Sequence, residues 1–173
     1  MARIYVLRHA KTEFASSSGA DFDRRLTDRG IRNGRQIGQY IARHLAIPDC
    51  VVTSPAARCL ETTELVVAQS PAFPEPVKDG RIYEAGLESL LNILAEHGKG
   101  VERLLLVGHN PGMIMLTHSL TAEDGNIAAR NIADFPTATL AELVIAGDDV
   151  ASAAVGEARL VSFLRPRDLG FNR

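Results

Sequence analysis

The sequence predicts an α/β protein with a mostly parallel central sheet, and two observations carry this prediction. Short apolar runs occupy positions 4–7, 50–53 and 104–107, and each has the length and composition of a buried strand. Apolar residues at helical spacing follow each run, as in chains whose strands alternate with crossover helices. Ligands of such folds bind at the carboxyl ends of the strands, so the residues that follow each run form the candidate site.

The composition fits one globular domain over residues 1–173. Hydrophobic residues make up 46% of the chain and charged residues 23%, which suffices for a full core and excludes a disordered chain. The net charge of -2 gives no general attraction to nucleic acid or to an anionic membrane.

No signal-peptide pattern opens the chain and no run approaches the ~20 apolar residues of a membrane span, so we expect a cytoplasmic protein. Cys50 and Cys59 lack the paired spacing of zinc sites or disulfide frameworks and are expected to be small buried residues.

The first predicted strand leads directly into a group of basic side chains. Arg8, His9 and Lys11 follow the run 4–7, and this position places Arg8 and His9 on the floor of a ligand crevice. The competing interpretation is that both residues simply begin a solvated loop. Residues 13–23 have no helical or strand period, so we expect a mobile surface loop that could border the ligand.

A long helix and a second strand come next. Thr27 is the expected N-cap of a helix that reaches about Leu45, because Ile37, Ile41 and Leu45 recur at four-residue spacing. The apolar run 50–53 then predicts the second strand.

The second strand leads into a strong helix-start signal. Ser54 is the expected N-cap and Pro55 the first helical residue. Arg58 then lies in the first helical turn, where the amino end of the helix adds partial positive charge. A second arginine is therefore expected at the end of a strand.

A third junction carries an acidic residue. Residues 77–83 predict a weaker or irregular strand, and a leucine-rich helix follows over 87–94 and ends at Gly98. Glu84 lies at this junction. Taken alone, it is more simply a surface carboxylate or a helix-start charge, because glutamate is seldom buried.

The run 104–107 is the clearest buried strand, and it leads to His109 before apolar residues at helical spacing resume over 113–120. Residues 121–136 predict only a partial helix and a loop. The runs 140–145 and 158–164 predict two further strands that form an antiparallel pair at a sheet edge.

Polar side chains thus follow four strand-like segments: Arg8 with His9, Arg58, Glu84 and His109. The carboxyl ends of neighbouring strands meet in one pocket, so we expect these groups to converge. Two arginines, a helix amino end and two imidazoles suit a phosphoryl group, because guanidinium groups pair bidentately with phosphate oxygens. A metal site is the competing use of the histidines, but no metal-binding spacing such as HExxH occurs and the arginines would repel a cation.

The chemistry of such a pocket is phosphoryl transfer. A neutral imidazole among cationic neighbours is a competent nucleophile toward phosphorus, because like-charge repulsion lowers its pKa. Arg8, Arg58 and His109 would spread the charge on the equatorial oxygens of an in-line transition state. Glu84 could protonate the leaving group and later deprotonate the attacking water.

Four segments carry a family resemblance: LRHAKT at 7–12, TSPAARCLET at 53–62, YEA at 83–85 and VGHNPG at 107–112. In this order they resemble the signature segments of the histidine phosphatase superfamily, and the Arg-His-Ala-Lys form is similar to the SixA-type phosphohistidine phosphatases. The resemblance extends over about residues 2–164.

The resemblance implies a phosphoglycerate mutase-like fold, a three-layer α/β/α arrangement with a mostly parallel sheet and no cap domain. It implies His9 as the phosphorylated nucleophile and Arg8, Arg58 and His109 as the phosphate pocket, with no cofactor and no metal. Larger members of the superfamily carry an acid in the segment that corresponds to Glu84, with a longer motif around it. The same resemblance places Thr137 near the pocket, where a loop-capping hydroxyl is the alternative role.

The spacing between Glu84 and His109 bears on the substrate. It leaves room for one helix and one strand, whereas the mutases and many small-molecule phosphatases of the superfamily carry inserted segments that cover the pocket. An uncovered site could admit a phosphorylated side chain on another protein, since it encloses a small metabolite poorly. We therefore expect phosphohistidine on a phosphorelay or phosphotransfer protein as substrate. A small phosphomonoester and, from another class, a non-catalytic phosphate-binding module are the alternatives.

Overall fold

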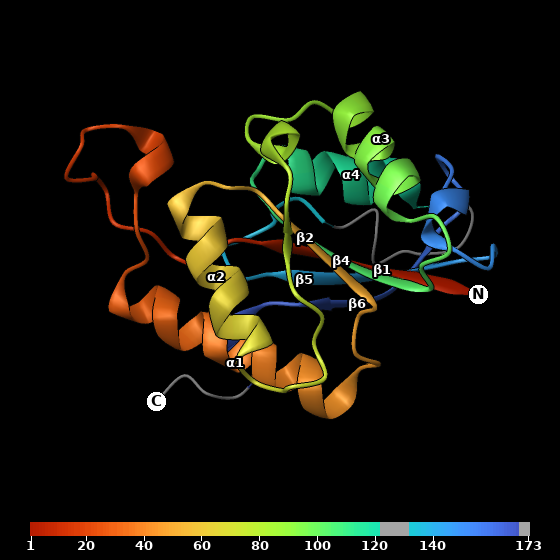
Figure 1. Cartoon of the computed structure of the whole chain (residues 1–173), viewed down its shortest axis with the longest axis horizontal. Coiled ribbons are helices and arrows are strands. Elements are labelled where there is room, and N and C mark those ends of the chain that lie inside the picture. The colour runs from red at the N-terminus through yellow and green to blue at the C-terminus, as the bar shows by residue number, and fades with distance from the viewer. Residues whose placement is uncertain (122–131, 170–173) are drawn as a thin grey trace.

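The computed structural model describes residues 1–121 and 132–169 and shows an α/β fold with helices on both faces of one six-stranded sheet (Figure 1). The strands are β1 (Ala2–Arg8), β2 (Cys50–Thr53), β3 (Val77–Lys78), β4 (Arg103–Gly108), β5 (Leu140–Ile145) and β6 (Arg159–Leu164). The helices are α1 (Asp28–His44), α2 (Ala57–Val67), α3 (Leu87–His97) and α4 (Gly112–Leu120). Short 3₁₀ turns are η1 (Asp21–Asp23), η2 (Gly80–Ile82), η3 (Val150–Ser152) and η4 (Pro166–Leu169).

The strands lie in the order β3-β2-β4-β1-β5-β6. Strands β1 to β4 run parallel, whereas β5 runs antiparallel to β1 and β6 antiparallel to β5. This confirms the mostly parallel sheet with an antiparallel pair at one edge. The register pairs Val107 of β4 with Leu7 on one side and Thr53 on the other, so the carboxyl ends of β1, β2 and β4 are level.

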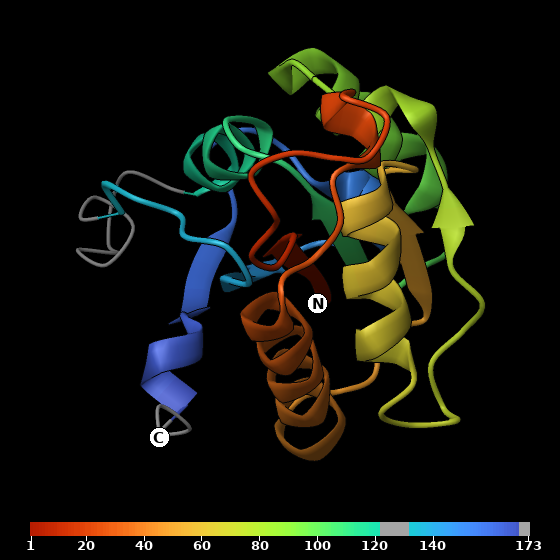
Figure 2. The same ribbon diagram turned by 90° about the vertical axis from the view of Figure 1, so that its left-hand side faces the viewer.

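The two faces of the sheet each have a core. Side chains alternate between faces along a strand, so Ile4 and Leu106 join the core beneath α3 and α4, whereas Tyr5 and Leu105 join the core beneath α1 and α2. Figure 2 shows the two helix pairs on opposite sides of the sheet. Burial on both faces explains why the central strands are apolar at consecutive positions, as the sequence predicted.

The first long helix follows its prediction closely. The Thr27 side chain caps α1 by accepting a hydrogen bond of 3.0 Å from the Gly30 backbone N–H, and Leu45 is its C-cap. Gly30 lies against the chain segment that leaves β1. A Cβ at this position would lie 2.1 Å from the carbonyl oxygen of Lys11, so only glycine allows this approach. Helix α1 thus packs directly behind the segment that carries His9.

The predicted start of α2 was wrong. The helix begins at Ala57 with Ala56 as N-cap, and Ala56 makes no side-chain cap bond. Ser54 is fully buried, and its hydroxyl accepts a hydrogen bond of 3.3 Å from the Ala56 N–H while lying 2.8 Å from Nε2 of His109. The serine therefore shapes the turn before the helix and contacts a site residue.

One further prediction needs correction. The segment 77–83 pairs as a strand only in β3, because the Asp79 carboxylate accepts a bond of 3.0 Å from the backbone N–H of Arg81 and starts the turn η2. The predicted loop 13–23 is a loop that ends in the turn η1.

The remaining expectations concern the two cysteines, the segment 121–136 and membrane-spanning helices. Cys59 is buried whereas Cys50 is only half-buried, and both are free thiols. The partial helix expected over 121–136 falls largely on residues 122–131, outside the described residues. Across 1–121 and 132–169, no helix is long and apolar enough to cross a membrane.

Candidate active site

A cavity of about 560 Å³ lies at the carboxyl ends of β1, β2 and β4. Its lining includes Arg8, His9, Lys11, Thr12, Asp21, Arg24, Arg58, Tyr83, Glu84, Ala85, His109, Asn110, Pro111 and Thr137. The structure therefore brings together all of the site residues predicted from the four strand ends. Lys11 and Thr137 border the same space.

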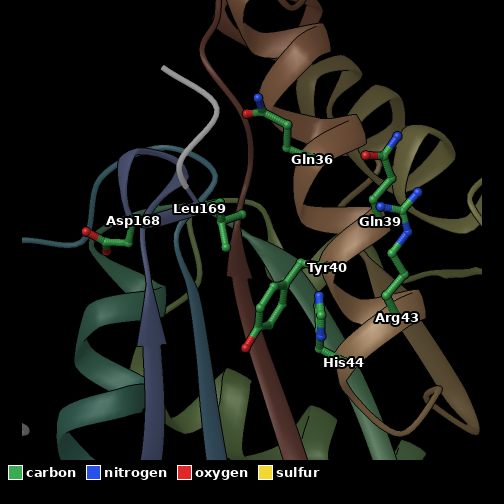
Figure 3. Close-up of a pocket in the computed structure, with 7 residues that line it drawn as sticks. All are labelled: Gln36, Gln39, Tyr40, Arg43, His44, Asp168 and Leu169. Atoms are coloured by element: carbon green, nitrogen blue, oxygen red, sulfur yellow. The ribbon is translucent and has the colours of Figure 1, made fainter. Parts of the chain in front are cut away.

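A second hollow of about 460 Å³ lies between α1 and η4 (Figure 3). Gln36, Gln39, Tyr40, Arg43, His44, Asp168 and Leu169 line it. It shares no residue with the cavity at the strand ends, and its lining includes the rings of Tyr40 and His44, whose centroids are 5.0 Å apart. The arginines and histidines predicted from the strand ends meet in the cavity at the strand ends, which we take as the candidate active site.

His9 follows β1, and its backbone N–H donates to the Gly108 carbonyl oxygen at 3.0 Å, which holds the residue beside the end of β4. Its Nδ1 lies 2.8 Å from the carbonyl oxygen of Ala10. A carbonyl only accepts, so Nδ1 carries the proton and Nε2 keeps its lone pair. The pKa of His9 is lowered to about 3: burial is the largest cause, the bond to Ala10 opposes it, and the charges of His109, Arg58 and Arg8 add to the lowering.

His109 follows β4 and faces His9, with ring centroids 5.4 Å apart. Its Nε2 lies 2.8 Å from the Ser54 hydroxyl oxygen and 3.5 Å from the Cys59 sulfur. The Tyr83 ring meets it edge-on, with a centroid separation of 5.4 Å. Burial, followed by the charge of Arg58, lowers the pKa of His109 to about 4. Both imidazoles are therefore neutral at neutral pH.

Arg8 and Arg58 supply the positive charge of the cavity. Arg8 donates from Nη1 to the Phe135 carbonyl oxygen at 2.9 Å, and its Nε is one of the buried polar atoms without a partner within the described part of the chain. A buried unpaired donor beside a cavity fits an anionic ligand. Arg58 lies in the first turn of α2, and its side chain is 7% exposed.

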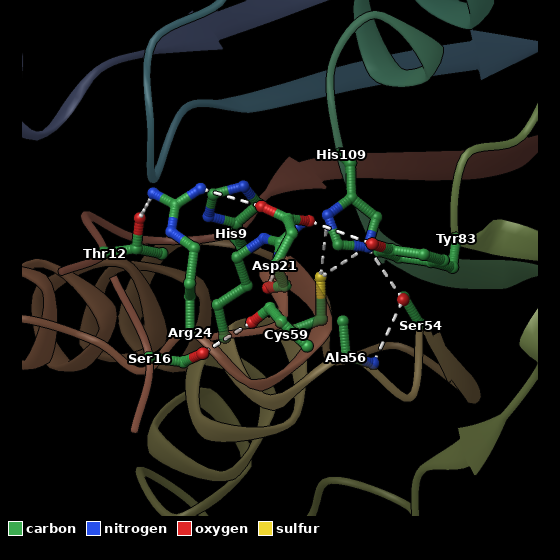
Figure 4. Close-up of polar contacts among 12 residues, drawn as sticks. His9, Thr12, Ser16, Asp21, Arg24, Ser54, Ala56, Cys59, Tyr83 and His109 are labelled. Atoms are coloured by element: carbon green, nitrogen blue, oxygen red, sulfur yellow. Dashed lines mark hydrogen bonds and ion pairs between the residues drawn. The ribbon is translucent and has the colours of Figure 1, made fainter. Parts of the chain in front are cut away.

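Asp21 is a site residue that the sequence analysis missed. Its carboxylate accepts hydrogen bonds of 2.9 Å from each of Arg24, Arg58 and the Tyr83 hydroxyl, and Figure 4 shows it between Arg24 and Tyr83. The bond from Arg24, followed by those from Tyr83 and Arg58, lowers the pKa of Asp21 to about 2. The only signal in the sequence was the position of the loop directly after β1.

Glu84 lies exposed at the rim of the cavity. Its φ of 55° is in the left-handed region, which residues other than glycine rarely adopt and which is found preferentially at functional sites. Glu84 therefore borders the same cavity as Arg58 and His109, in a strained backbone conformation.

The charges of the cavity suit an anion. Arg8, Arg24 and Arg58 line it together with the neutral imidazoles, and the amino end of α2 adds partial positive charge. Within residues 1–121 and 132–169, no group of three or more His, Cys, Asp or Glu side chains could hold a metal ion.

We expect both imidazoles to remain neutral down to about pH 5, because their pKa values lie below the ordinary histidine value of about 6.5. Each ring gains its proton only as the pH falls through its lowered pKa, so the lone pair on His9 is retained above that range. An NMR titration of the imidazole Cε1–H signals measures the two pKa values, with His9→Ala and His109→Ala used to assign the signals. A titration midpoint near the ordinary value for His9 would contradict it.

Comparison with known proteins identifies the family. The model of the histidine phosphatase superfamily, branch 1, matches residues 4–88. An uncharacterised protein of Mycobacterium tuberculosis is 33% identical over 165 residues, which cover 93% of this chain and 100% of the relative.

Two solved structures agree with this. A protein from Agrobacterium tumefaciens, designated a SixA phosphohistidine phosphatase, is 33% identical with a TM-score of 0.79 and covers 95% of this chain and 99% of its own. A protein from Nakamurella multipartitia with the same designation is 26% identical with a TM-score of 0.84. The match covers 95% of this chain and 96% of that protein. The resemblance seen in the four sequence segments is confirmed, and the chain belongs to the histidine phosphatase superfamily, branch 1.

Proposed function

We propose that this chain is a phosphohistidine phosphatase in which His9 is the nucleophile. The observation that carries the proposal is the buried His9 ring, whose Nδ1 is bonded to the Ala10 carbonyl oxygen so that the unprotonated Nε2 is free within a cavity of arginines. The family and the SixA-designated neighbours support a phosphatase. A role in phosphorelay signalling in the cytoplasm is part of the proposal.

The reaction has two displacements at phosphorus. In the first, Nε2 of His9 forms a bond to phosphorus while the bond from phosphorus to the substrate nitrogen breaks, and the departing imidazole takes up a proton. In the second, the oxygen of a water molecule forms a bond to phosphorus and loses a proton while the bond from phosphorus to Nε2 of His9 breaks, which releases orthophosphate and restores the lone pair on Nε2. Glu84 at the rim is the proposed donor of the first proton and acceptor of the second.

Arg8, Arg58 and His109 are the proposed phosphate pocket. Arg8 and Arg58 offer their guanidinium groups to the equatorial oxygens, where charge is concentrated in the in-line transition state. His109 is neutral, so one ring nitrogen donates a hydrogen bond without adding charge. The arginines provide the charge that a metal supplies in other phosphatases, so the proposal needs no metal and no cofactor.

The chain between Glu84 and His109 supports a substrate carried by a protein. It holds only α3 and β4 among its helices and strands, so no inserted segment there covers the cavity. A phosphorylated side chain on another protein can enter such a site, and the scissile nitrogen–phosphorus bond needs less help from an acid than an ester bond does. We therefore propose a phosphohistidine-carrying phosphorelay or phosphotransfer domain as substrate.

Trapping of the phosphorylated enzyme tests this proposal. The chain is mixed with a phosphohistidine peptide or with p-nitrophenyl phosphate, quenched rapidly without acid, and examined by intact-mass spectrometry with His9→Ala as the blank. We expect one phosphoryl adduct on the wild type only, formed faster from the peptide. Equal or faster formation from the ester would move the substrate to small phosphomonoesters. Absence of an adduct from either would favour a phosphate-binding module.

A further inference from the structure

An acidic side chain occupies the pocket in which the proposed enzyme binds phosphate. The Asp21 carboxylate oxygen Oδ2 lies 2.9 Å from Nη2 of Arg58, and the Asp21 backbone carbonyl accepts from Nη1 at 2.7 Å. Asp21 and Arg58 both line the cavity that holds His9. A phosphoryl group binds a guanidinium through the same pair of N–H donors that a carboxylate uses. Asp21 and the phosphoryl group therefore compete for Arg58.

The competition is between two anions. The bonds from Arg24, Tyr83 and Arg58 hold the pKa of Asp21 at about 2, so its carboxylate is charged throughout the neutral range. A phosphoryl dianion on Arg58 meets this negative charge at contact distance, where like charges repel.

The two partners differ in their freedom to move. The Arg58 side chain is 7% exposed and is held in the first turn of α2, whereas the Asp21 side chain is 50% exposed. Asp21 belongs to the turn η1, in which no residue is buried. Arg24 donates separately to the other carboxylate oxygen at 2.9 Å, so Asp21 keeps a cationic partner when it leaves Arg58. The carboxylate is therefore the partner that moves.

We propose that Asp21 is an internal competitor of phosphate: its carboxylate occupies Arg58 between turnovers, leaves when the phosphorylated substrate enters, and returns as orthophosphate departs. This rests on the proposed function. Breaking the ion pair between Asp21 and Arg58 costs binding free energy. A phosphorylated protein can offset this cost through contacts away from the phosphoryl group, whereas orthophosphate and small esters have no such protein surface. Asp21 thus favours phosphoryl groups carried by a protein and lowers the affinity for the product, orthophosphate.

The test is the affinity for orthophosphate, measured by isothermal titration calorimetry on the wild type and on Asp21→Asn. Asparagine keeps the shape and removes the charge, so we expect the Kd for orthophosphate to fall at least ~10-fold. Asp23→Asn is the matched control, because it removes the same charge from η1 while its carboxylate bonds to Ser18 outside the cavity. We expect this control to stay within roughly twofold of the wild type.

Two further variants separate charge from shape. Asp21→Glu retains the charge and is expected to keep the wild-type Kd within a few-fold, and Asp21→Ala, which removes the charge and the side-chain bonds, is expected to bind orthophosphate as tightly as Asp21→Asn. If thermal unfolding shows that Asp21→Asn is not folded, the comparison uses Asp21→Ala. Unchanged or weaker orthophosphate binding in the uncharged variants would overturn the proposal and make Asp21 a residue that positions Arg58. Binding requires no turnover, so a failure of His9 to become phosphorylated would overturn the proposed function alone.

Discussion

Replacing His9 with alanine is expected to lower kcat by a factor on the order of 10³ to 10⁶, because the covalent route disappears while the binding groups remain. Nε2 of His9 is the free, unprotonated nitrogen at the floor of the cavity, whereas Nε2 of His109 lies against the Ser54 hydroxyl. The two rings are 5.4 Å apart, but only His9 is oriented by a bond that leaves Nε2 open. The rate of orthophosphate release from a phosphohistidine peptide measures the effect.

His44→Ala is the matched control for this prediction. His44 lies on α1 in the separate hollow next to η4, so its loss is expected to leave kcat within about twofold of the wild type. Calorimetry with orthophosphate should show that His9→Ala retains the phosphate pocket, since Arg8 and Arg58 are unchanged. Turnover by His9→Ala at the wild-type rate would exclude His9 as the nucleophile.

Replacing Arg58 with alanine is expected to lower kcat/KM by roughly 10³-fold, because its charge stabilises the transition state in a poorly hydrated site. The side chain is 7% exposed, and its guanidinium lies 5.8 Å from the Tyr83 ring centroid. Arg58→Lys is expected to restore only part of the loss, because a lysine ammonium is a point charge and cannot bind two oxygens in one plane. Steady-state kinetics with the same peptide measure both variants.

Arg25→Ala provides the comparison for Arg58→Ala. The Arg25 side chain is 75% exposed and pairs with Glu61 outside the cavity, so its loss removes an arginine charge without touching the site. We expect its kcat/KM to stay within a few-fold of the wild type. Equal losses from Arg25→Ala and Arg58→Ala would mean that overall charge, and not the Arg58 guanidinium, determines the rate.

Much of the fold could be predicted because its signals are local. The runs 50–53 and 140–145 coincide with β2 and β5, and the cap at Thr27 is where the pattern placed it. The convergence of Arg8, His9, Arg58, Glu84 and His109 followed from a rule about strand ends, and the level register of β1, β2 and β4 is its physical basis.

The two failed predictions have different causes. Ser54 has the sequence context of a helix cap, but His109, 55 positions away, lies against its hydroxyl. There a tertiary contact outweighed a local preference of about 1 kcal/mol. The segment after β3 begins with Asp79-Gly80, and the Asp79 carboxylate caps the turn η2 through the backbone N–H of Arg81, so a local turn signal outweighed the apolar residues that follow.

The sequence by itself determined the α/β class, the strands and helices that place the site, and which polar residues meet at the strand ends. These depend on periodicity, on residues next to one another in the chain, and on motifs such as 107–112. Only the tertiary structure decided that Asp21 enters the cavity at the strand ends. Its partners Arg58 and Tyr83 lie 37 and 62 positions away. Those bonds depend on where η1 packs against the end of α2, and no local pattern in an exposed loop encodes that position.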